Sequence, residues 1–186
     1  MADGVRGARR VPPDVLARAR AVRLVVLDVD GVLTDGRIIY GPGGLELKAF
    51  DVRDGHGVKM FHRAGLRTAI ITGRTSEVVV RRAQELEIAD VIQGSHDKLA
   101  AYRDLLARHA LDDAQVACLG DDVTDLPLLA RAGLAVAVPG AAPEARAAAH
   151  YVTRRAGGRG AVREVLDLIL QAQGLWEAAL ARYRAD

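Results

Sequence analysis

Asp28 and Asp30 stand two residues apart, directly after the apolar run at residues 23–27. The run is short, rich in Val and Leu, and without helical spacing, so it predicts a buried parallel strand. In an extended chain, residues i and i+2 point to the same side, so both carboxylates face one small volume. Like charges that close are costly unless a cation binds or a proton is shared. The pair therefore indicates a nucleophile and an acid–base group beside a metal, with Gly31 permitting the sharp exit of the chain.

Three later segments place further polar side chains at or just beyond strand ends. Thr72 ends an apolar strand and is followed by glycine, where a hydroxyl and backbone N–H groups can hold a phosphate oxygen. Lys98 opens a helical pattern, where a cation opposes the helix dipole, which favours a functional reason for it. A third strand ends at Asp121, and Asp125 opens the next helix. Taken singly, these are equally a turn threonine, a solvated lysine and a helix-capping aspartate.

Their order along the chain is informative. An acid pair, a threonine, a lysine and an acid cluster all fall at the carboxyl ends of parallel strands, the edge where open α/β sheets bind ligands. This order resembles that of the haloacid dehalogenase-like phosphatases. The resemblance implies that Asp28 attacks phosphorus and forms an aspartyl-phosphate, while Asp30 serves as general acid and then general base. It implies Mg²⁺ held by the Asp28 side chain, the Asp30 carbonyl and Asp121.

The same resemblance assigns supporting roles. Thr72 and Lys98 would stabilise the equatorial phosphoryl oxygens. Asp122 and Asp125 would lie behind the metal ligands, with Asp125 orienting Lys98.

The elements that position these residues alternate between strand and helix. We expect helices over residues 57–64, 76–86, 99–109, 126–131 and 161–173, and later strands over 134–138 and 151–152. This pattern predicts one doubly wound parallel α/β domain over residues 1–186, with a frayed start at 1–20 and a tail at 174–186. No interval between the motifs holds a cap domain, so the domain is expected to be capless.

Residues 36–51 interrupt the alternation. Two short apolar stretches flank the turn signal Gly-Pro-Gly-Gly at 41–44, which predicts a β-hairpin inserted after the first strand. Leu45, Leu47 and Ala49 alternate with polar or bulky residues, so one face of the hairpin is apolar. A lone hairpin is marginal in water. That face therefore needs a partner, either another subunit or the hairpin's own domain.

The hairpin and the glycine-rich run at 157–164 narrow the resemblance to the 3-deoxy-D-manno-octulosonate 8-phosphate phosphatases, over residues 23–174. That family implies a Mg²⁺-dependent homotetramer acting in lipopolysaccharide inner-core synthesis. It makes Arg74 and Arg82 candidates for binding a sugar-acid carboxylate. Arg159, in the glycine-rich run, could reach a substrate anion in its own or a neighbouring subunit. His56 and residues 139–148 depart from the family pattern.

Three alternatives remain open on the sequence. A phosphatase of another keto-sugar acid, such as a nonulosonate 9-phosphate, uses the same motifs. A phospho-receiver domain also combines aspartates, threonine and lysine with Mg²⁺, although its phosphorylated aspartate follows a later strand than its acid pair. A non-catalytic oligomeric scaffold would not require the complete set of acids, threonine and lysine.

Composition agrees with an enzyme acting on a small molecule. Half of the 186 residues are hydrophobic, and a net charge of +2 argues neither for nucleic acid nor for a membrane surface. Cys118 lies in an apolar strand and is expected to be a core residue. No apolar run reaches the ~18 residues of a membrane helix, and no secretory signal is present. These features predict a cytoplasmic protein.

Overall fold

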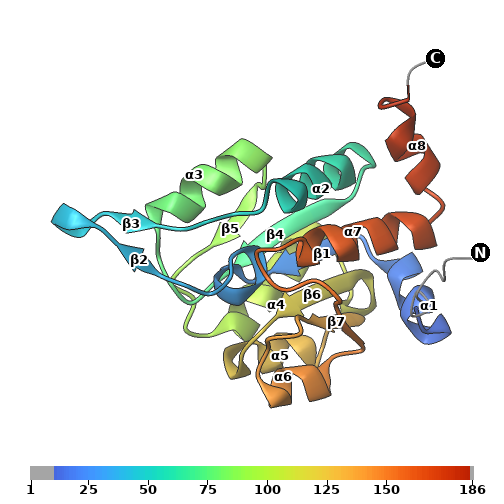
Figure 1. Ribbon diagram of the computed structural model, residues 1–186. Coiled ribbons are helices and arrows are strands. Elements are labelled where there is room, and N and C mark those ends of the chain that lie inside the picture. The colour runs from blue at the N-terminus through green and yellow to red at the C-terminus, as the bar shows by residue number, and fades with distance from the viewer. Residues whose placement is uncertain (1–10, 185–186) are drawn as a thin grey trace, which may run out of the picture.

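The computed structural model describes residues 11–184 and contains a six-stranded, fully parallel sheet with helices on both faces (Figure 1). The strand order is β5-β4-β1-β6-β7-β8. The strands are β1 (Leu24–Leu27), β4 (Arg67–Ile71), β5 (Asp90–Ile92), β6 (Val116–Gly120), β7 (Leu134–Ala137) and β8 (Tyr151–Val152). The predicted doubly wound α/β domain is confirmed, and the short edge strand β5 is an element that the sequence pattern did not indicate.

Strand β1 lies in the centre of the sheet, between β4 and β6. All four of its residues are buried, which explains the unbroken apolar run, since a central parallel strand is covered on both faces. Val25 and Leu27 face one core cluster, and Leu24 and Val26 face the other. Alternate side chains of the strand thus pack into the hydrophobic clusters on opposite faces of the sheet.

The helices divide between these layers. The cluster around Val25 and Leu27 is covered by α1 (Pro13–Ala21), α2 (Val52–Arg63), α3 (Glu77–Leu86) and α7 (Ala161–Ala172). The opposite cluster is covered by α4 (Lys98–His109), α5 (Leu126–Leu129) and α6 (Pro143–Ala148). Cys118 is buried in the second cluster, as expected of a core residue.

The expectation of a frayed start over residues 1–20 is wrong from Pro13 onward. Helix α1 begins there, and the side chains of Val15 and Ala19 have 0% exposure. Both pack into the cluster that α7 also covers, so tertiary burial rather than local sequence orders this helix. Residues 1–10 lie outside the described part of the chain.

The helix expected at residues 57–64 begins earlier, at Val52. Asp51 caps it by accepting a hydrogen bond from the backbone N–H of Arg53 at 2.7 Å. The internal Gly55 and Gly57, which disfavour a helix locally, permit close packing instead. A Cβ at Gly55 would lie 2.2 Å from Arg82 Nη2, and one at Gly57 would lie 2.7 Å from the Cδ atom of Arg163.

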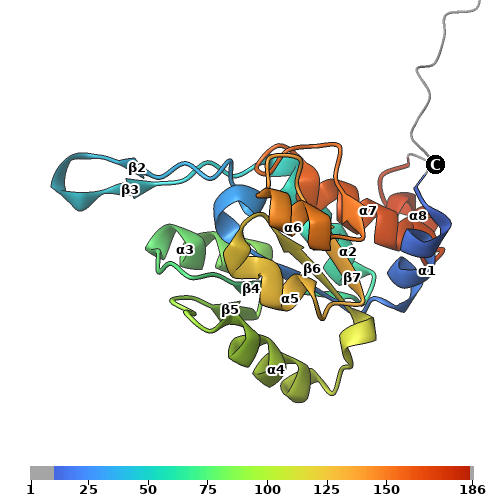
Figure 2. The ribbon, with the colours of Figure 1, turned by 90° about the horizontal axis from the view of Figure 1, so that it is seen from below.

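The predicted hairpin is present as β2 (Ile39–Tyr40) and β3 (Glu46–Leu47), which form an antiparallel ribbon extending away from the main sheet (Figure 2). Leu45 and Leu47 are 54% and 47% exposed. On the opposite side of the ribbon, the Lys48 side chain is fully buried. The apolar face of the hairpin is therefore turned to solvent in the single chain.

After Gly174 the chain forms a short helix, α8 (Trp176–Ala181), within the expected tail. Tyr183 then lies edge-on to His56, with ring centroids 5.3 Å apart, so the described part of the tail returns to α2. Among the helices of the described residues, none is long and apolar enough to cross a membrane.

Candidate active site

A cavity of about 510 Å³ opens at the carboxyl edge of the sheet, beyond the ends of β1, β4 and β6. It collects most of the residues that the sequence singled out. Its lining includes Asp28, Asp30, Thr72, Arg74, Lys98, Asp121 and Asp122.

Lys98 is the first residue of α4, and its ammonium group joins two aspartates. Its Nζ donates to Asp28 Oδ1 at 2.8 Å and to Asp125 Oδ1 at 2.6 Å, with all three side chains less than 10% exposed. Burial lowers the pKa of Lys98, but the charges of Asp28 and Asp125 and their hydrogen bonds outweigh it, so that the pKa is raised overall. Lys98 is therefore a fixed cation at the bottom of the cavity.

Both carboxylate oxygens of Asp125 are engaged. Oδ1 accepts from Lys98, and Oδ2 accepts from the backbone N–H groups of Asp121 at 2.9 Å and Asp122 at 3.2 Å. This arrangement holds the loop after β6 and fixes the direction of the Lys98 side chain.

Asp28 and Asp121 are crowded carboxylates. Burial raises the pKa of Asp28 to about 6, with a further increase from Asp125 that Lys98 opposes. Burial, followed by the charges of Asp28, Asp125 and Asp122, raises the pKa of Asp121 to about 7. Oxygens of Asp28, Asp121 and Asp125 lie within 4.8 Å of one another. Because both oxygens of Asp125 already accept hydrogen bonds, Asp28 and Asp121 are the side chains more available to a divalent cation, which would relieve their repulsion.

Gly31 makes this crowding possible. Its φ of +102° is a conformation that favours glycine, and a Cβ there would lie 2.0 Å from Asp121 Oδ2. The turn after the acid pair must therefore be glycine, both for its backbone and for the approach of Asp121.

Thr72 is buried just after β4, and its backbone hydrogen-bonds to the segment around β5. Its backbone N–H donates to Ile92 O at 2.9 Å, and its carbonyl accepts from the backbone N–H of Ser95 at 3.0 Å. The end of β4 is thus joined to the end of β5 and to the loop that follows β5.

Two residues of the hairpin also reach the site, and the sequence reasoning assigned them no role. Lys48 forms ion pairs with Asp30 and Glu46. The Tyr40 hydroxyl accepts from Arg74 Nη2 at 3.2 Å, and Arg74 Nε lies 3.8 Å from Asp30 Oδ2. The available signal was the alternation of the second hairpin strand, which places Lys48 on the face opposite Leu47.

Arg82 and Arg159 are not among the residues that line the cavity. The Arg82 guanidinium lies 5.6 Å from the centre of the Phe50 ring and donates to Glu85 at 3.2 Å. Arg159 lies 3.9 Å from Asp35 and lines a neighbouring hollow of about 340 Å³, whose lining shares Asp121 with the cavity. A single chain therefore brings Arg74, but neither of these two arginines, to the cavity.

Comparison with known proteins agrees with this geometry. Residues 68–166 match the haloacid dehalogenase-like hydrolase family. The chain is 51% identical to the 3-deoxy-D-manno-octulosonate 8-phosphate phosphatase of Yersinia pestis, over 91% of this chain and 90% of that protein. The chain belongs to this phosphatase family of haloacid dehalogenase-like hydrolases. Family membership removes the phospho-receiver interpretation.

Solved structures of this family share the fold closely. A 3-deoxy-D-manno-octulosonate 8-phosphate phosphatase from Moraxella catarrhalis, in complex with a magnesium ion, a phosphate ion and a KDO molecule, superposes with a TM-score of 0.90 at 43% identity. The alignment covers 92% of this chain and 98% of that one. A probable phosphatase from Pseudomonas syringae gives a TM-score of 0.92 at 48% identity, covering 94% and 99%.

Proposed function

We propose that the protein is a Mg²⁺-dependent phosphatase that hydrolyses 3-deoxy-D-manno-octulosonate 8-phosphate to the sugar acid and phosphate. The observation that carries the proposal is the buried Lys98 that joins Asp28 to Asp125 next to Asp121. Relatives of about half identity that bear this activity in their names support the substrate. A cytoplasmic role in lipopolysaccharide inner-core synthesis follows from the same likeness.

Asp28 is the proposed nucleophile. Its carboxylate lies at the strand end, and the 2.8 Å contact with Lys98 favours the ionised form against the effect of burial. Attack of the carboxylate on phosphorus forms the aspartyl-phosphate while the bond from phosphorus to the sugar oxygen breaks. The leaving oxygen then needs a proton.

Asp30 is the proposed source of that proton. It lines the cavity, and its contacts with Lys48 and Arg74 hold it at the mouth rather than at the bottom. It gives the proton to the sugar oxygen and then takes one from the water that attacks the aspartyl-phosphate, which releases phosphate and restores Asp28.

The carboxylates of Asp28 and Asp121 and the backbone carbonyl of Asp30 would hold Mg²⁺, which supplies charge neutralisation for the phosphoryl group. Thr72 and Lys98 would hold the phosphoryl oxygens from the protein side. Asp125 keeps Lys98 in place. The supporting role of Asp122 stays a prediction from the family resemblance, because its exposed side chain accepts from the backbone N–H of Val123 at 2.8 Å. Mg²⁺ fits because the two aspartates with raised pKa values are the ones left free to coordinate.

Arg74 is the proposed partner of the sugar-acid carboxylate, because it lies in the cavity wall and is 44% exposed. Arg82 and Arg159 stay predictions from the family resemblance.

We further propose that the protein is a homotetramer assembled through the hairpins. Ile39, Leu45 and Leu47 are each about half exposed, and together they give the ribbon an apolar face that its own domain does not cover. Closed symmetric assembly is the common outcome for such a surface. Neighbouring chains would then cover the open cavity and exclude water from it.

The test is phosphate release from 3-deoxy-D-manno-octulosonate 8-phosphate and from a nonulosonate 9-phosphate, each measured with Mg²⁺ and with excess chelator. We expect Mg²⁺-dependent turnover with a higher kcat/KM for the first compound, and no turnover by Asp28→Asn. A higher kcat/KM for the nonulosonate 9-phosphate would identify that compound as the preferred substrate instead. No turnover of either compound would contradict the phosphatase proposal and favour a non-catalytic role.

A further inference from the structure

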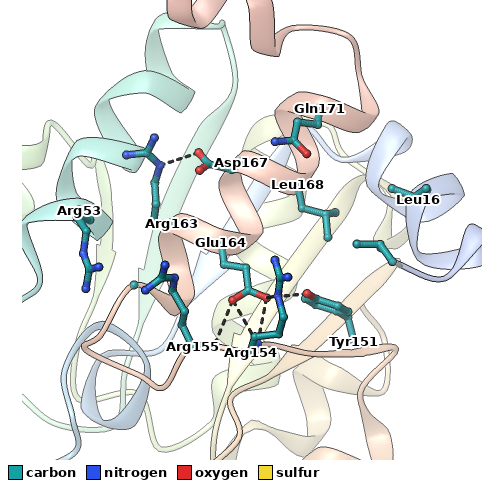
Figure 3. Close-up of a pocket in the computed structure, with 12 residues that line it drawn as sticks. Leu16, Arg53, Tyr151, Arg154, Arg155, Arg163, Glu164, Asp167, Leu168 and Gln171 are labelled. Atoms are coloured by element: carbon teal, nitrogen blue, oxygen red, sulfur yellow. Dashed lines mark hydrogen bonds and ion pairs between the residues drawn. The ribbon is translucent and has the colours of Figure 1, made fainter. Parts of the chain in front are cut away.

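A second hollow, of about 710 Å³, is larger than the active-site cavity and shares no lining residue with it. It lies between α7, the start of α2, α1 and the segment that runs from β8 to α7 (Figure 3). Among residues 11–184, four arginines and two acidic residues line it. The balance of charge in its lining is therefore positive.

Both acidic residues are already engaged. Glu164 accepts from the Tyr151 hydroxyl at 2.6 Å and from the backbone N–H groups of Arg154 and Arg155 at 3.0 Å (Figure 3). Asp167 accepts from Arg163 Nε at 2.7 Å. Glu164 therefore serves mainly to hold the loop, and it offers the Arg155 guanidinium no direct contact.

The side chains of Arg53 and Arg155 both pass close to Gly160. A Cβ built on Gly160 would lie 2.9 Å from the Cδ atom of Arg155 and 3.7 Å from Arg53 Nη2. Arg53 is held by a two-point contact with Asp51, at 3.1 and 2.7 Å, and its Nη2 also donates to Arg159 O at 3.3 Å, which leaves Nη1 for a ligand. Within the described residues, the Arg155 guanidinium has no hydrogen bond or ion pair. One guanidinium is thus positioned, and the other is free to bind.

The opposite wall of the hollow is apolar and aromatic, formed by Val11, Leu16, Leu168 and Tyr151. Basic groups on one side and apolar groups on the other are typical of sites for small molecules that carry an anionic group, and the volume lies in the range of ~300–1,000 Å³ for such sites. Arginine is well suited to phosphate because its planar fork donates two parallel hydrogen bonds.

We propose that this hollow is a second binding site, separate from the active site, for a small molecule that carries a phosphate or diphosphate group. Arg53 and Arg155 bind the anionic group above Gly160, while the Arg154 guanidinium stays paired with Glu164, with Nε 3.4 Å from Oε1. The apolar wall takes the remainder of the ligand. This proposal is independent of the phosphatase assignment, because none of its residues takes part in the proposed chemistry.

The test is calorimetric titration of the full-length protein with inorganic pyrophosphate in excess chelator. Without a metal ion, the active site presents the carboxylates of Asp28, Asp30 and Asp121 and repels anions, so the titration reports on the second site. We expect saturable binding that is weakened about tenfold or more in Arg155→Ala and in Arg53→Gln, since each removes a charged hydrogen-bond donor.

Two matched controls locate the binding. Arg103→Ala removes an exposed arginine of α4, a helix that covers the opposite face of the sheet from α7. Arg74→Ala removes the arginine that lines the active-site cavity. Both should bind pyrophosphate as the unmodified protein does, and all four variants should keep its thermal midpoint. No saturable heat, equal affinity in Arg155→Ala, or loss of binding in Arg74→Ala would each overturn the proposal.

Discussion

The carboxyl edge of the sheet and the hairpin lie next to each other and differ in how far one chain completes them. At the sheet edge, Asp28, Lys98 and Asp125 are buried and paired with one another. In the hairpin, only two residue pairs join the strands, and Leu45 and Leu47 remain about half exposed. The buried polar residues of the site are therefore complete within one chain, whereas the hairpin exposes an apolar surface that another chain could cover.

The sheet edge therefore provides the proposed reacting groups, and the hairpin contributes to the rim and the covering of the cavity. The fold of a single chain assembles the proposed nucleophile, the buried cation and the proposed metal ligands. The hairpin adds Lys48 and Tyr40 to the rim, through Asp30 and Arg74. Damage to the sheet edge should thus abolish turnover of every phosphate ester, and damage to the hairpin should affect mainly the substrate that extends out of the cavity.

The largest effect is expected from Lys98→Ala. It removes the cation that holds Asp28 and Asp125 and leaves two buried carboxylates without it, so kcat should fall about 10²–10³-fold or more. Steady-state phosphate release measures this loss. Lys59→Ala, which breaks an exposed ion pair with Glu87, is the matched control and should keep full activity. Comparable activity in the two variants would remove Lys98 from the mechanism.

Gly31→Ala should lower kcat about a hundredfold, because the new methyl group would displace the Asp121 carboxylate. Weaker Mg²⁺ activation should accompany the loss. Gly43→Ala isolates the backbone effect, since its φ is also positive but nothing lies within 4 Å of the added Cβ. If both variants lost activity equally, backbone strain rather than contact with Asp121 would be the cause.

Leu45→Asp combined with Leu47→Asp should dissociate the assembly and lower kcat/KM for the sugar phosphate about tenfold, with a smaller loss for a small aryl phosphate. Light scattering and parallel kinetics on the two substrates measure these effects. Ala100→Asp with Ala107→Asp adds the same charge to exposed positions of α4 and should change neither. An unmodified protein that is monomeric at micromolar concentration, with full sugar-phosphate activity, would contradict the proposed assembly.

A smaller, pH-dependent effect is expected in the metal-free protein. The pKa values of Asp28 and Asp121 are about 6 and about 7 in the folded chain, above the ordinary value of 3.8. The folded state therefore retains protons that the unfolded state has already released, and stability should fall as pH rises from about 4 to about 7. Burial also raises the pKa of Asp54 to about 6, with the same sign.

Thermal unfolding in chelator should accordingly give a lower midpoint at about pH 7.5 than at about pH 5. Added Mg²⁺ should stabilise more at the higher pH, because the ligands must be deprotonated to bind it. Asp121→Asn should flatten the dependence. A midpoint that rises over this interval in chelator would contradict the crowding of these carboxylates.

The sequence predicted the sheet edge well because each key residue follows a strand or opens a helix. Asp28, Thr72 and Asp121 come directly after apolar runs whose parallel order brings their ends to one edge. That logic depends only on local pattern and topology, which is why the positions of these residues could be expected without a structure.

Contacts between distant elements were harder to predict. The helix expected from residue 57 begins at Val52 and runs through Gly55 and Gly57, whose missing side chains leave room for Arg82 and Arg163. Helix α1 depends on burial against the core rather than on its own sequence. The family resemblance made Arg82 a candidate for the substrate carboxylate, and in the single chain its guanidinium lies over the Phe50 ring.

The most direct test of the central claim is to stop the reaction rapidly during turnover of 3-deoxy-D-manno-octulosonate 8-phosphate and map the phosphoryl group by mass spectrometry. Asp28→Asn and Asp30→Asn provide the comparison, because both aspartates fall within the same stretch of chain. The account predicts one phosphoryl group on Asp28 in the unmodified protein, and none at this position in Asp28→Asn. Turnover with no phosphorylated Asp28, or with the phosphoryl group on Asp30, would contradict it.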